Sequence, residues 1–365
     1  MDEKKIIESG YLPKELPPGY LSKDLAVKLE DVKGRWQTFY DAENTKTQEE
    51  SRADFNARKK EFSKKYGSSK CWVYSISKGI YSRRPLGIPN PKHFLKVVEL
   101  ICSKWDDYQA IFTSSKFSTS YPIEETRVGK RSVRTFSKRV ADLRDKVLER
   151  SVSKFFQVKL DISKYYPTIY THVIPWSFLG KEVSKNYFKK SRTEIDAEIA
   201  AGNINALLYV YANKLGTAVR NCQDKQSVGI PIGPDTSHII SELVACKIDE
   251  EFNSKFETLG FEGCRYFDDY YIFADSLDQA DAIKGLQKIL NKYQLELNDK
   301  KIEVKSFPFA FENEWVTDLH RFEFKETNFT IGLKHYFSSI WSIAENNKSR
   351  TDWVFKYSLR RFEFV

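Results

Sequence analysis

Long apolar runs, cysteine motifs and low-complexity segments are all missing from this 365-residue sequence. The longest uninterrupted apolar run, Ala206–Ala212, has seven residues, whereas a membrane-spanning helix needs about 20. The five cysteines are odd in number, widely spaced and without a CxxC pair, which argues against a disulfide framework or a zinc site. The 16 glycines and 12 prolines are too few for a collagen-like chain. We expect no membrane partner, and reduced, mostly buried thiols.

The N-terminus also lacks the features of a secretory leader. It reads MDEKKIIESG, with acidic residues where a signal peptide carries a basic flank and an apolar stretch. We therefore expect a cytoplasmic protein. Apolar residues make up 41% of the chain and aromatic residues 15%, which excludes disorder over most of its length. The length suggests two or three packed units.

Acidic residues are scarce in one part of the chain. Residues 51–150 contain 23 basic and 10 acidic side chains, a net charge of +13, and the remaining residues together carry −4. A basic segment beside a slightly acidic remainder indicates a polyanionic partner that one region holds. Charge alone leaves this interpretation and a solvated basic surface about equally favoured.

Three aspartates stand where apolar strands are expected to end. Asp161 follows the apolar segment 155–160, and Asp268 and Asp269 interrupt CRYFDDYYIFA, which predicts a hairpin with an acidic turn. Carboxylates in apolar strands are costly to bury unless a cation neutralises them. Magnesium is the natural partner, with manganese as an alternative, and two such ions activate an attacking oxygen and stabilise the leaving one. An isolated Asp-Asp pair would more simply be a hairpin turn.

Five ordered segments resemble the fingers and palm motifs of reverse transcriptases. They are RRPLGIP (83–89), LDISKYYPTIYTHVIPW (160–176), GIPIGPDTS (229–237), YFDD (266–269) and LNDKKIE (297–303). The Tyr-x-Asp-Asp box is weak alone, but five ordered matches over about 220 residues are specific. Segment 160–176 and the N-terminal GYLPKELPPGYLS further resemble the bacterial abortive-infection and defence-associated reverse transcriptases of the AbiK type.

This resemblance implies an α+β fold of the right-hand type, in which an antiparallel sheet packs on helices. We expect an N-terminal region and fingers over residues 1–150, a palm over 151–315, and the start of a short helical thumb over 316–365. Relatives of the AbiK type continue into a C-terminal helical-repeat domain, which we do not expect in this chain.

The resemblance also assigns catalytic roles. Asp161 and Asp268 match the metal-binding aspartates, the backbone carbonyl of Ile162 completes the shell of one magnesium ion, and Asp269 matches the second aspartate of the box. Lys301 matches the lysine that protonates the leaving pyrophosphate, with Lys300 one residue away.

Three further positions match nucleotide-binding residues of the family. Arg84 matches the fingers arginine that grips the triphosphate, although Arg83 is its neighbour, and Lys78 is a lysine partner whose spacing fits poorly. Tyr166 lies five residues after Asp161 and matches the ring beneath the incoming sugar, where it clashes with a 2′-hydroxyl.

Gly233 completes the expected nucleotide site, whereas Tyr165 does not belong to it. Tyr165 is expected to face the core, because only one of the two adjacent rings can face the sugar. Gly233 lets the backbone approach the nucleotide and template base. Ile232 stands where many reverse transcriptases have glutamine, which is compatible with untemplated or narrowly templated synthesis.

A basic cluster next to Tyr121 and Phe136 predicts contacts with nucleic-acid phosphates and bases. Its members are Arg127, Lys130, Arg131, Arg134, Lys138 and Arg139, of which the first four are the expected nucleic-acid-binding residues. The expected partners are an RNA template such as a cognate noncoding RNA, a DNA product, dNTPs, and a second polymerase subunit or second copy of the chain. The expected activity is RNA-directed DNA polymerisation in antiphage defence. A catalytically quiet module of the same fold that binds RNA or a partner is the alternative.

Overall fold

The computed structural model describes the chain except residues 79–80, 138–139, 277–281, 308–313, 325–328, 349–350 and 363–365. The chain divides into two compact units, Met1–Phe307 and Pro308–Val365. The predicted boundaries between fingers, palm and thumb stay predictions.

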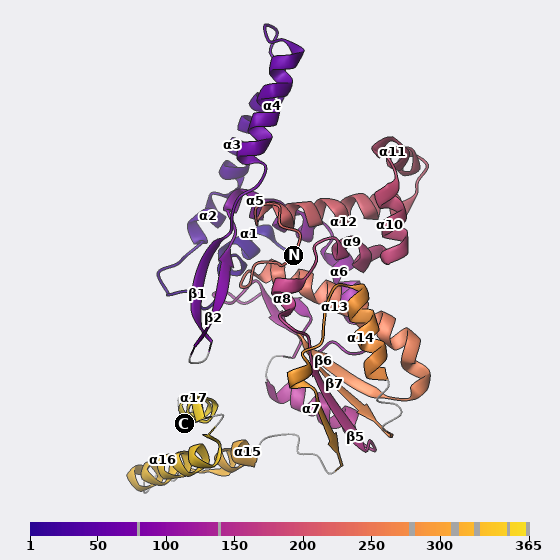
Figure 1. The fold of residues 1–365 in the computed structure, drawn as a ribbon. Coiled ribbons are helices and arrows are strands. Elements are labelled where there is room, and N and C mark those ends of the chain that lie inside the picture. The colour runs from indigo at the N-terminus through magenta and orange to yellow at the C-terminus, as the bar shows by residue number, and fades with distance from the viewer. Residues whose placement is uncertain are drawn as a thin grey trace. The chain divides into compact units, whose positions relative to one another are not determined.

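A four-stranded antiparallel sheet lies in the first unit, with the strand order β6-β7-β5-β8 (Figure 1). The strands are β5 (Phe156–Asp161), β6 (Glu262–Tyr266), β7 (Asp269–Ala274) and β8 (Glu303–Ser306). The expected strand that ends on Asp161 is present. The expected hairpin is also present, but its two-residue turn is Phe267–Asp268, one residue earlier than predicted, because Asp269 already pairs with Asp161 in the sheet.

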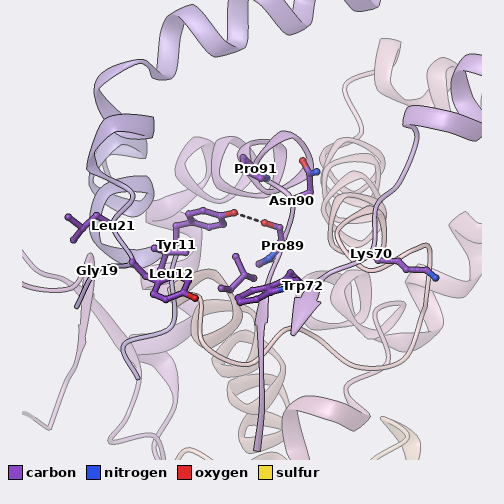
Figure 2. Close-up of a pocket in the computed structure, with 11 residues that line it drawn as sticks. Tyr11, Leu12, Gly19, Leu21, Lys70, Trp72, Pro89, Asn90 and Pro91 are labelled. Carbon is purple, nitrogen blue, oxygen red and sulfur yellow. Dashed lines mark hydrogen bonds between the residues drawn. The ribbon is translucent and has the colours of Figure 1, made fainter. Parts of the chain in front are cut away.

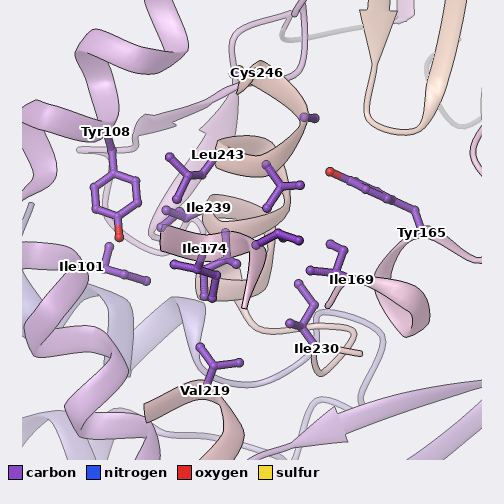
Figure 3. Close-up of a cluster of buried hydrophobic side chains, with 14 of the residues drawn as sticks. Ile101, Tyr108, Tyr165, Ile169, Ile174, Val219, Ile230, Ile239, Leu243 and Cys246 are labelled. Carbon is purple, nitrogen blue, oxygen red and sulfur yellow. The ribbon is translucent and has the colours of Figure 1, made fainter. Parts of the chain in front are cut away.

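Helix α13 (Asp235–Phe256) is the central helix of this unit, because most of its side chains are buried. It packs against α6, α9 and α14. Leu243, Ile239, Ile174 and Ile101 belong to the same core cluster (Figure 3). The other helices of this part are α5 (Pro91–Ser103), α6 (Trp105–Ser114), α7 (Val140–Ser151), α8 (Tyr165–Thr168), α9 (Val173–Leu179), α10 (Lys181–Lys189), α11 (Arg192–Ala200), α12 (Ile204–Asn221), α14 (Ala282–Lys292) and the short turns η2 (Glu257–Leu259) and η4 (Asp299–Lys301).

The N-terminal part of the first unit combines short helices, a helical hairpin and two β-ribbons. Helices α3 and α4 lie side by side and project from the rest of the unit as an arm (Figure 1). The two ribbons are the antiparallel pairs β1-β2 and β3-β4. The elements are α1 (Glu3–Lys5), η1 (Ile6–Gly10), α2 (Lys23–Val27), α3 (Leu29–Asn44), α4 (Arg52–Tyr66), β1 (Trp72–Lys78), β2 (Ser82–Ile88), β3 (Pro122–Glu124) and β4 (Val133–Thr135).

The second unit contains three described helices, α15 (Glu314–Arg321), α16 (Phe329–Asn346) and α17 (Thr351–Phe362). They share a small core in which Leu319, Tyr336, Ile340 and Val354 are buried.

The mixture of helices with antiparallel strands confirms the predicted α+β class. Within the described ranges, no helix is long and apolar enough to cross a membrane. All five cysteines are free thiols, three of them buried, as expected.

Candidate active site

The three aspartates of the predicted catalytic set come together at one end of the sheet. Asp161 ends β5 and is directly opposite Asp269, the first residue of β7. Residues directly opposite in an antiparallel pair lie on the same face. Asp268 lies in the adjoining turn, after Phe267 with its left-handed φ of 54°, and its carbonyl accepts a 3.0 Å hydrogen bond from the backbone N–H of Ile162. The hairpin turn is thus fastened to the end of β5.

These carboxylates repel one another in a partly dehydrated site. Burial, together with the charges of Asp269 and Asp161, raises the pKa of Asp268 to about 6. Burial also raises the pKa of Asp269, with a contribution from Asp161, while Lys159 acts in the opposite direction from 4.0 Å away. A bound cation would relieve this repulsion, because it would stabilise the charged form of each carboxylate.

Two side chains from the segment before β8 hold Asp161. Lys301 Nζ donates to Asp161 Oδ1 at 2.7 Å, and Asn298 Nδ2 donates to Oδ2 at 3.2 Å. Lys301 lies in the turn η4, whose geometry directs this lysine, not the adjacent Lys300, to the carboxylate. The ion pair raises the pKa of Lys301. The lysine therefore remains protonated next to the acidic group.

The donor atoms at this end of the sheet fit a hard divalent cation. Carboxylate and carbonyl oxygens are the ligands that magnesium prefers, and no donor in the described part of the chain reaches the carbonyl oxygen of Ile162. Among described residues, no three Asp, Glu, His or Cys side chains already surround one point as a metal site would require. The chemistry of the donors supports magnesium binding by Asp161, Asp268 and Asp269.

A buried arginine that the sequence analysis did not single out supports the acidic turn. Arg265 on β6 is fully buried. Its guanidinium donates to Glu242 and Asp249 on α13 at 2.6 and 2.8 Å. It also donates to the carbonyl of Phe267 at 2.9 Å. Burial alone would lower the pKa of Arg265, but the two carboxylates hold it well above its ordinary value.

This arginine was recognisable from the sequence. It interrupts the apolar strand segment GCRYF, and a charge in a buried strand requires a partner. Its carboxylate partners, Glu242 and Asp249, are seven residues apart on α13 and therefore share one helix face. The network positions the residue immediately before Asp268, so we regard Arg265 as a positioning residue.

The two adjacent tyrosines differ in burial, although their rings meet edge to face with 5.9 Å between the centroids. Tyr165 is buried, and its hydroxyl donates to the carbonyl of Ser241 at 2.5 Å, so the predicted core role is confirmed. Tyr166 is half-buried. Burial raises the pKa of Tyr166, and the charges of Glu242 and Asp268 add to this effect, which places its hydroxyl in the electrostatic field of the acidic site. Both tyrosines lie in the helical turn α8 rather than in a strand.

The β1-β2 ribbon presents Arg84 and Lys78 on one face. Arg84 is opposite Ile76, and Lys78 is two residues beyond Ile76 on the same strand. Arg83 lies on the other face, where its Nε donates to Ser75 Oγ at 2.8 Å. Neither Arg84 nor Lys78 has an ion-pair partner among the described residues, so both remain available for a phosphate.

Gly233 is shielded by the N-terminal segment. It has a φ of 127°, and a Cβ at this position would come within 2.4 Å of the ring of Pro13. Both the backbone conformation and the contact therefore require glycine. Its carbonyl accepts a 3.0 Å hydrogen bond from Arg131. The structure thus provides a packing reason for this glycine, and its predicted contact with a nucleotide stays a prediction.

Four members of the predicted basic cluster have different surroundings, and the other two, Lys138 and Arg139, lie outside the described residues. Arg131 pairs with Asp235, with 3.0 Å between Nε and Oδ1, and Arg127 pairs with the buried carboxylate of Glu125. Lys130 is exposed, and Arg134 donates only a long 3.4 Å hydrogen bond to the carbonyl of its neighbour Thr135. Lys130 and Arg134 are therefore more available to a phosphate than Arg127 and Arg131.

The aromatic rings beside this cluster form a stacked pair. The centroids of Tyr121 and Phe136 are 4.8 Å apart, with 14° between the ring planes. Phe136 is 43% exposed, so its outer face is open to a further ring.

Comparison with known proteins assigns the family. The sequence model described as reverse transcriptase (RNA-dependent DNA polymerase) matches residues 82–331, more than half of the chain. The chain therefore belongs to the reverse transcriptase family. This match confirms the expected reverse-transcriptase fold. No curated protein matches the chain.

Two solved structures of apo telomerase from Candida tropicalis are similar to the chain. The form truncated from its C-terminal domain shares 10% identity and a TM-score of 0.43, with 83% of this chain and 59% of that chain covered. The other shares 13% identity and a TM-score of 0.41, with 99% and 66% covered. The chain thus spans less than two thirds of the length of either telomerase.

Proposed function

We propose that this chain is an RNA-directed DNA polymerase of a bacterial antiphage defence system, which joins dNTPs to a 3′-hydroxyl or a protein primer. The observation that carries the polymerase activity is the convergence of Asp161, Asp268 and Asp269 at one end of the sheet in a member of this family. The defence role is supported by the resemblance of segments 10–22 and 160–176 to the AbiK type. The template is a dedicated noncoding RNA, or synthesis proceeds without a template.

Asp161, Asp268, Asp269 and the carbonyl of Ile162 would hold two magnesium ions. When bound, these ions activate the attacking oxygen and stabilise the leaving oxygens. The remaining steps belong to side chains. Lys301, whose pKa is raised by its ion pair with Asp161 so that it stays protonated, would supply a proton to the leaving pyrophosphate.

Recognition of the incoming nucleotide is assigned to the ribbon and to α8. Arg84 and Lys78 provide positive charge for the triphosphate from one ribbon face. Tyr166 limits the room beneath the sugar. The backbone N–H of Gly87 donates to the carbonyl of Ile232 at 2.8 Å, and that of Ile230 donates to the carbonyl of Tyr166 at 3.0 Å. These bonds link both recognition elements to the 229–237 loop.

The experiment that tests this function measures incorporation of radiolabelled dNTPs and NTPs by the purified chain, with and without magnesium. We expect magnesium-dependent incorporation of dNTPs. Incorporation of NTPs alone would indicate an RNA polymerase. No incorporation under any primer and template condition, with nucleic-acid binding retained, would indicate a catalytically quiet module.

Replacing Tyr166 with alanine is expected to admit rNTPs while dNTP use persists. The Tyr166 ring is expected to clash with the 2′-hydroxyl of an rNTP, and fitting excess volume into a packed site costs typically 1–3 kcal/mol. Because alanine removes this cost, the preference for dNTPs over rNTPs should fall about 5- to 150-fold. Competition assays with paired dNTP and rNTP substrates measure this ratio. Tyr165→Ala is the matched control: it should lower the free energy of unfolding by about 3–5 kcal/mol without changing the ratio. A changed ratio in Tyr165→Ala alone would contradict the assignment.

Nucleic-acid affinity is expected to fall steeply with salt, because residues 51–150 carry a net charge of +13. Helix α4 contributes exposed cations, among them Lys60 and Lys64, for which the described residues provide no ion-pair partner. Counterion release predicts a slope of log K against log salt of about −0.7 per phosphate contact on a single strand. Fluorescence anisotropy measures the slope, with a methylphosphonate oligonucleotide as the uncharged control. Equal slopes for the two backbones would refute this prediction.

A further inference from the structure

An open cavity of about 520 Å³ lies between the N-terminal proline-rich segment, the start of β1 and the turn before α5 (Figure 2). Its volume lies within the range of small-ligand pockets. Its walls include Tyr11, Tyr20, Trp72 and Pro89, with Lys70 at the rim. None of these residues belongs to the acidic site described above. The cavity is therefore a separate feature of the first unit.

The walls of this cavity are aromatic and only partly covered. Trp72 is 53% exposed and Tyr20 is 45% exposed. Their rings are stacked, with centroids 6.4 Å apart and 21° between the planes, and Tyr74 extends the group at 6.3 Å from each. Exposed aromatic groups of this kind mark binding surfaces more often than folding cores. The arrangement offers flat apolar faces to a flat ligand.

The opposite wall is rigid. The hydroxyl of the buried Tyr11 donates to the carbonyl of Pro89 at 2.6 Å (Figure 2). Asn90 Oδ1 accepts a 3.0 Å hydrogen bond from the backbone N–H of Lys92 and so caps α5. Because these atoms are fixed by bonds within the fold, the cavity is formed before any ligand arrives, which lowers the entropic cost of binding.

Two cations, Lys70 and Arg84, lie near the aromatic group. Lys70 extends from the rim away from Trp72 (Figure 2), and the described residues offer it no ion-pair partner. Trp72 and Tyr74 share a ribbon face with Ile76 and, across the ribbon, with Arg84. A chain lying on this ribbon face would pass over the aromatic rings to an arginine.

We propose that this aromatic cavity binds a base of single-stranded nucleic acid outside the catalytic centre, with Lys70 contacting a neighbouring phosphate. Stacked rings beside cations are the features with which proteins hold single strands, because every base has a π-face and every linkage a charge. The inference rests on the proposed function, since a polymerase that copies or extends a strand must hold it beyond the site of addition. RNA and DNA offer the same chemistry here.

The proposal is tested by binding of short fluorescein-labelled oligo(U) and oligo(dT) to the full chain, in EDTA and without nucleotides. Trp72→Ala should weaken the binding of both about 5- to 150-fold, the range found for loss of one stacked base. Trp72→Phe should restore most of the affinity. Phe188→Ala, at a ring that is 72% exposed on α10, is the matched control and should bind like the wild type. Lys70→Gln should make the salt slope shallower by about 0.7.

Photocrosslinking of the wild-type chain with 4-thiouracil-substituted oligonucleotides gives a second measurement that needs no variant to fold. Crosslinks to Trp72 or Tyr20 support the proposal, and crosslinks found only elsewhere overturn it. The proposal is also overturned if Trp72→Ala binds oligonucleotides as tightly as Phe188→Ala does. It is overturned as well if a proline-rich peptide binds in the cavity and oligonucleotides do not. Because the assay contains neither magnesium nor dNTPs, failure of the polymerase function would appear only in the incorporation assay.

Discussion

The double substitution Asp268→Ala with Asp269→Ala is expected to abolish magnesium-dependent dNTP incorporation. These carboxylates are proposed to hold the cations, whose stabilisation of the transition state amounts to several kcal/mol. The rate should therefore fall by at least about 10³-fold. Incorporation of radiolabelled dNTPs into an extended primer measures the loss.

The same variant is expected to fold at least as well as the wild type. Burial and the neighbouring carboxylates raise the pKa of Asp268 to about 6, which means that its charged form, although it still predominates at neutral pH, is less stable in the fold than in the unfolded chain. Removal of both carboxylates removes this repulsion, so the melting temperature should stay equal or rise. Asp196→Ala on the exposed helix α11 is the control for loss of an acidic side chain. A double variant that polymerises like the wild type would show that the metal-binding residues lie elsewhere.

Much of the acidic site was predictable because its aspartates lie in short segments whose own composition indicates their secondary structure. The apolar segment before Asp161 and the apolar halves around YFDD predict strands by their composition. The order of the motifs then indicates that these strands share a sheet. The pairing of Asp161 with Asp269 follows from two short segments, each of which forms its own structure. The Tyr165 core position was likewise predictable from its place beside Tyr166.

The contacts that position the 229–237 loop were not predictable, because they join residues far apart in the chain. Aspartate is a residue type that commonly caps helices, but Asp235 lies one residue after the N-cap of α13, which is Pro234. Asp235 instead accepts hydrogen bonds from Arg131 and from the hydroxyl of Ser132. No local pattern indicates that a carboxylate at a helix start will pair with residues about a hundred positions earlier.

The substitution Arg265→Met is expected to have the largest effect on stability. Removing one partner from a buried ion network leaves the others charged and without compensation, which typically costs about 3–5 kcal/mol. Glu242 and Asp249 would both be left in this state. Methionine retains most of the volume, so the lost charge dominates over any cavity. Denaturant titration followed by tryptophan fluorescence measures the free energy of unfolding.

A matched pair of variants separates the buried network from ordinary ion pairs. Arg35→Met removes an arginine that pairs with Asp31 but is itself 79% exposed, while its carboxylate partner is 52% exposed. This variant should unfold at the same denaturant concentration as the wild type, because solvent screens exposed pairs. Adding Glu242→Gln and Asp249→Asn to Arg265→Met should recover part of the loss, since neutral amides no longer need the guanidinium. If Arg265→Met unfolds at the same denaturant concentration as Arg35→Met, the network contributes no net stability. In that case its remaining role is to hold the carbonyl of Phe267, and the variant would be impaired in polymerisation while remaining fully folded.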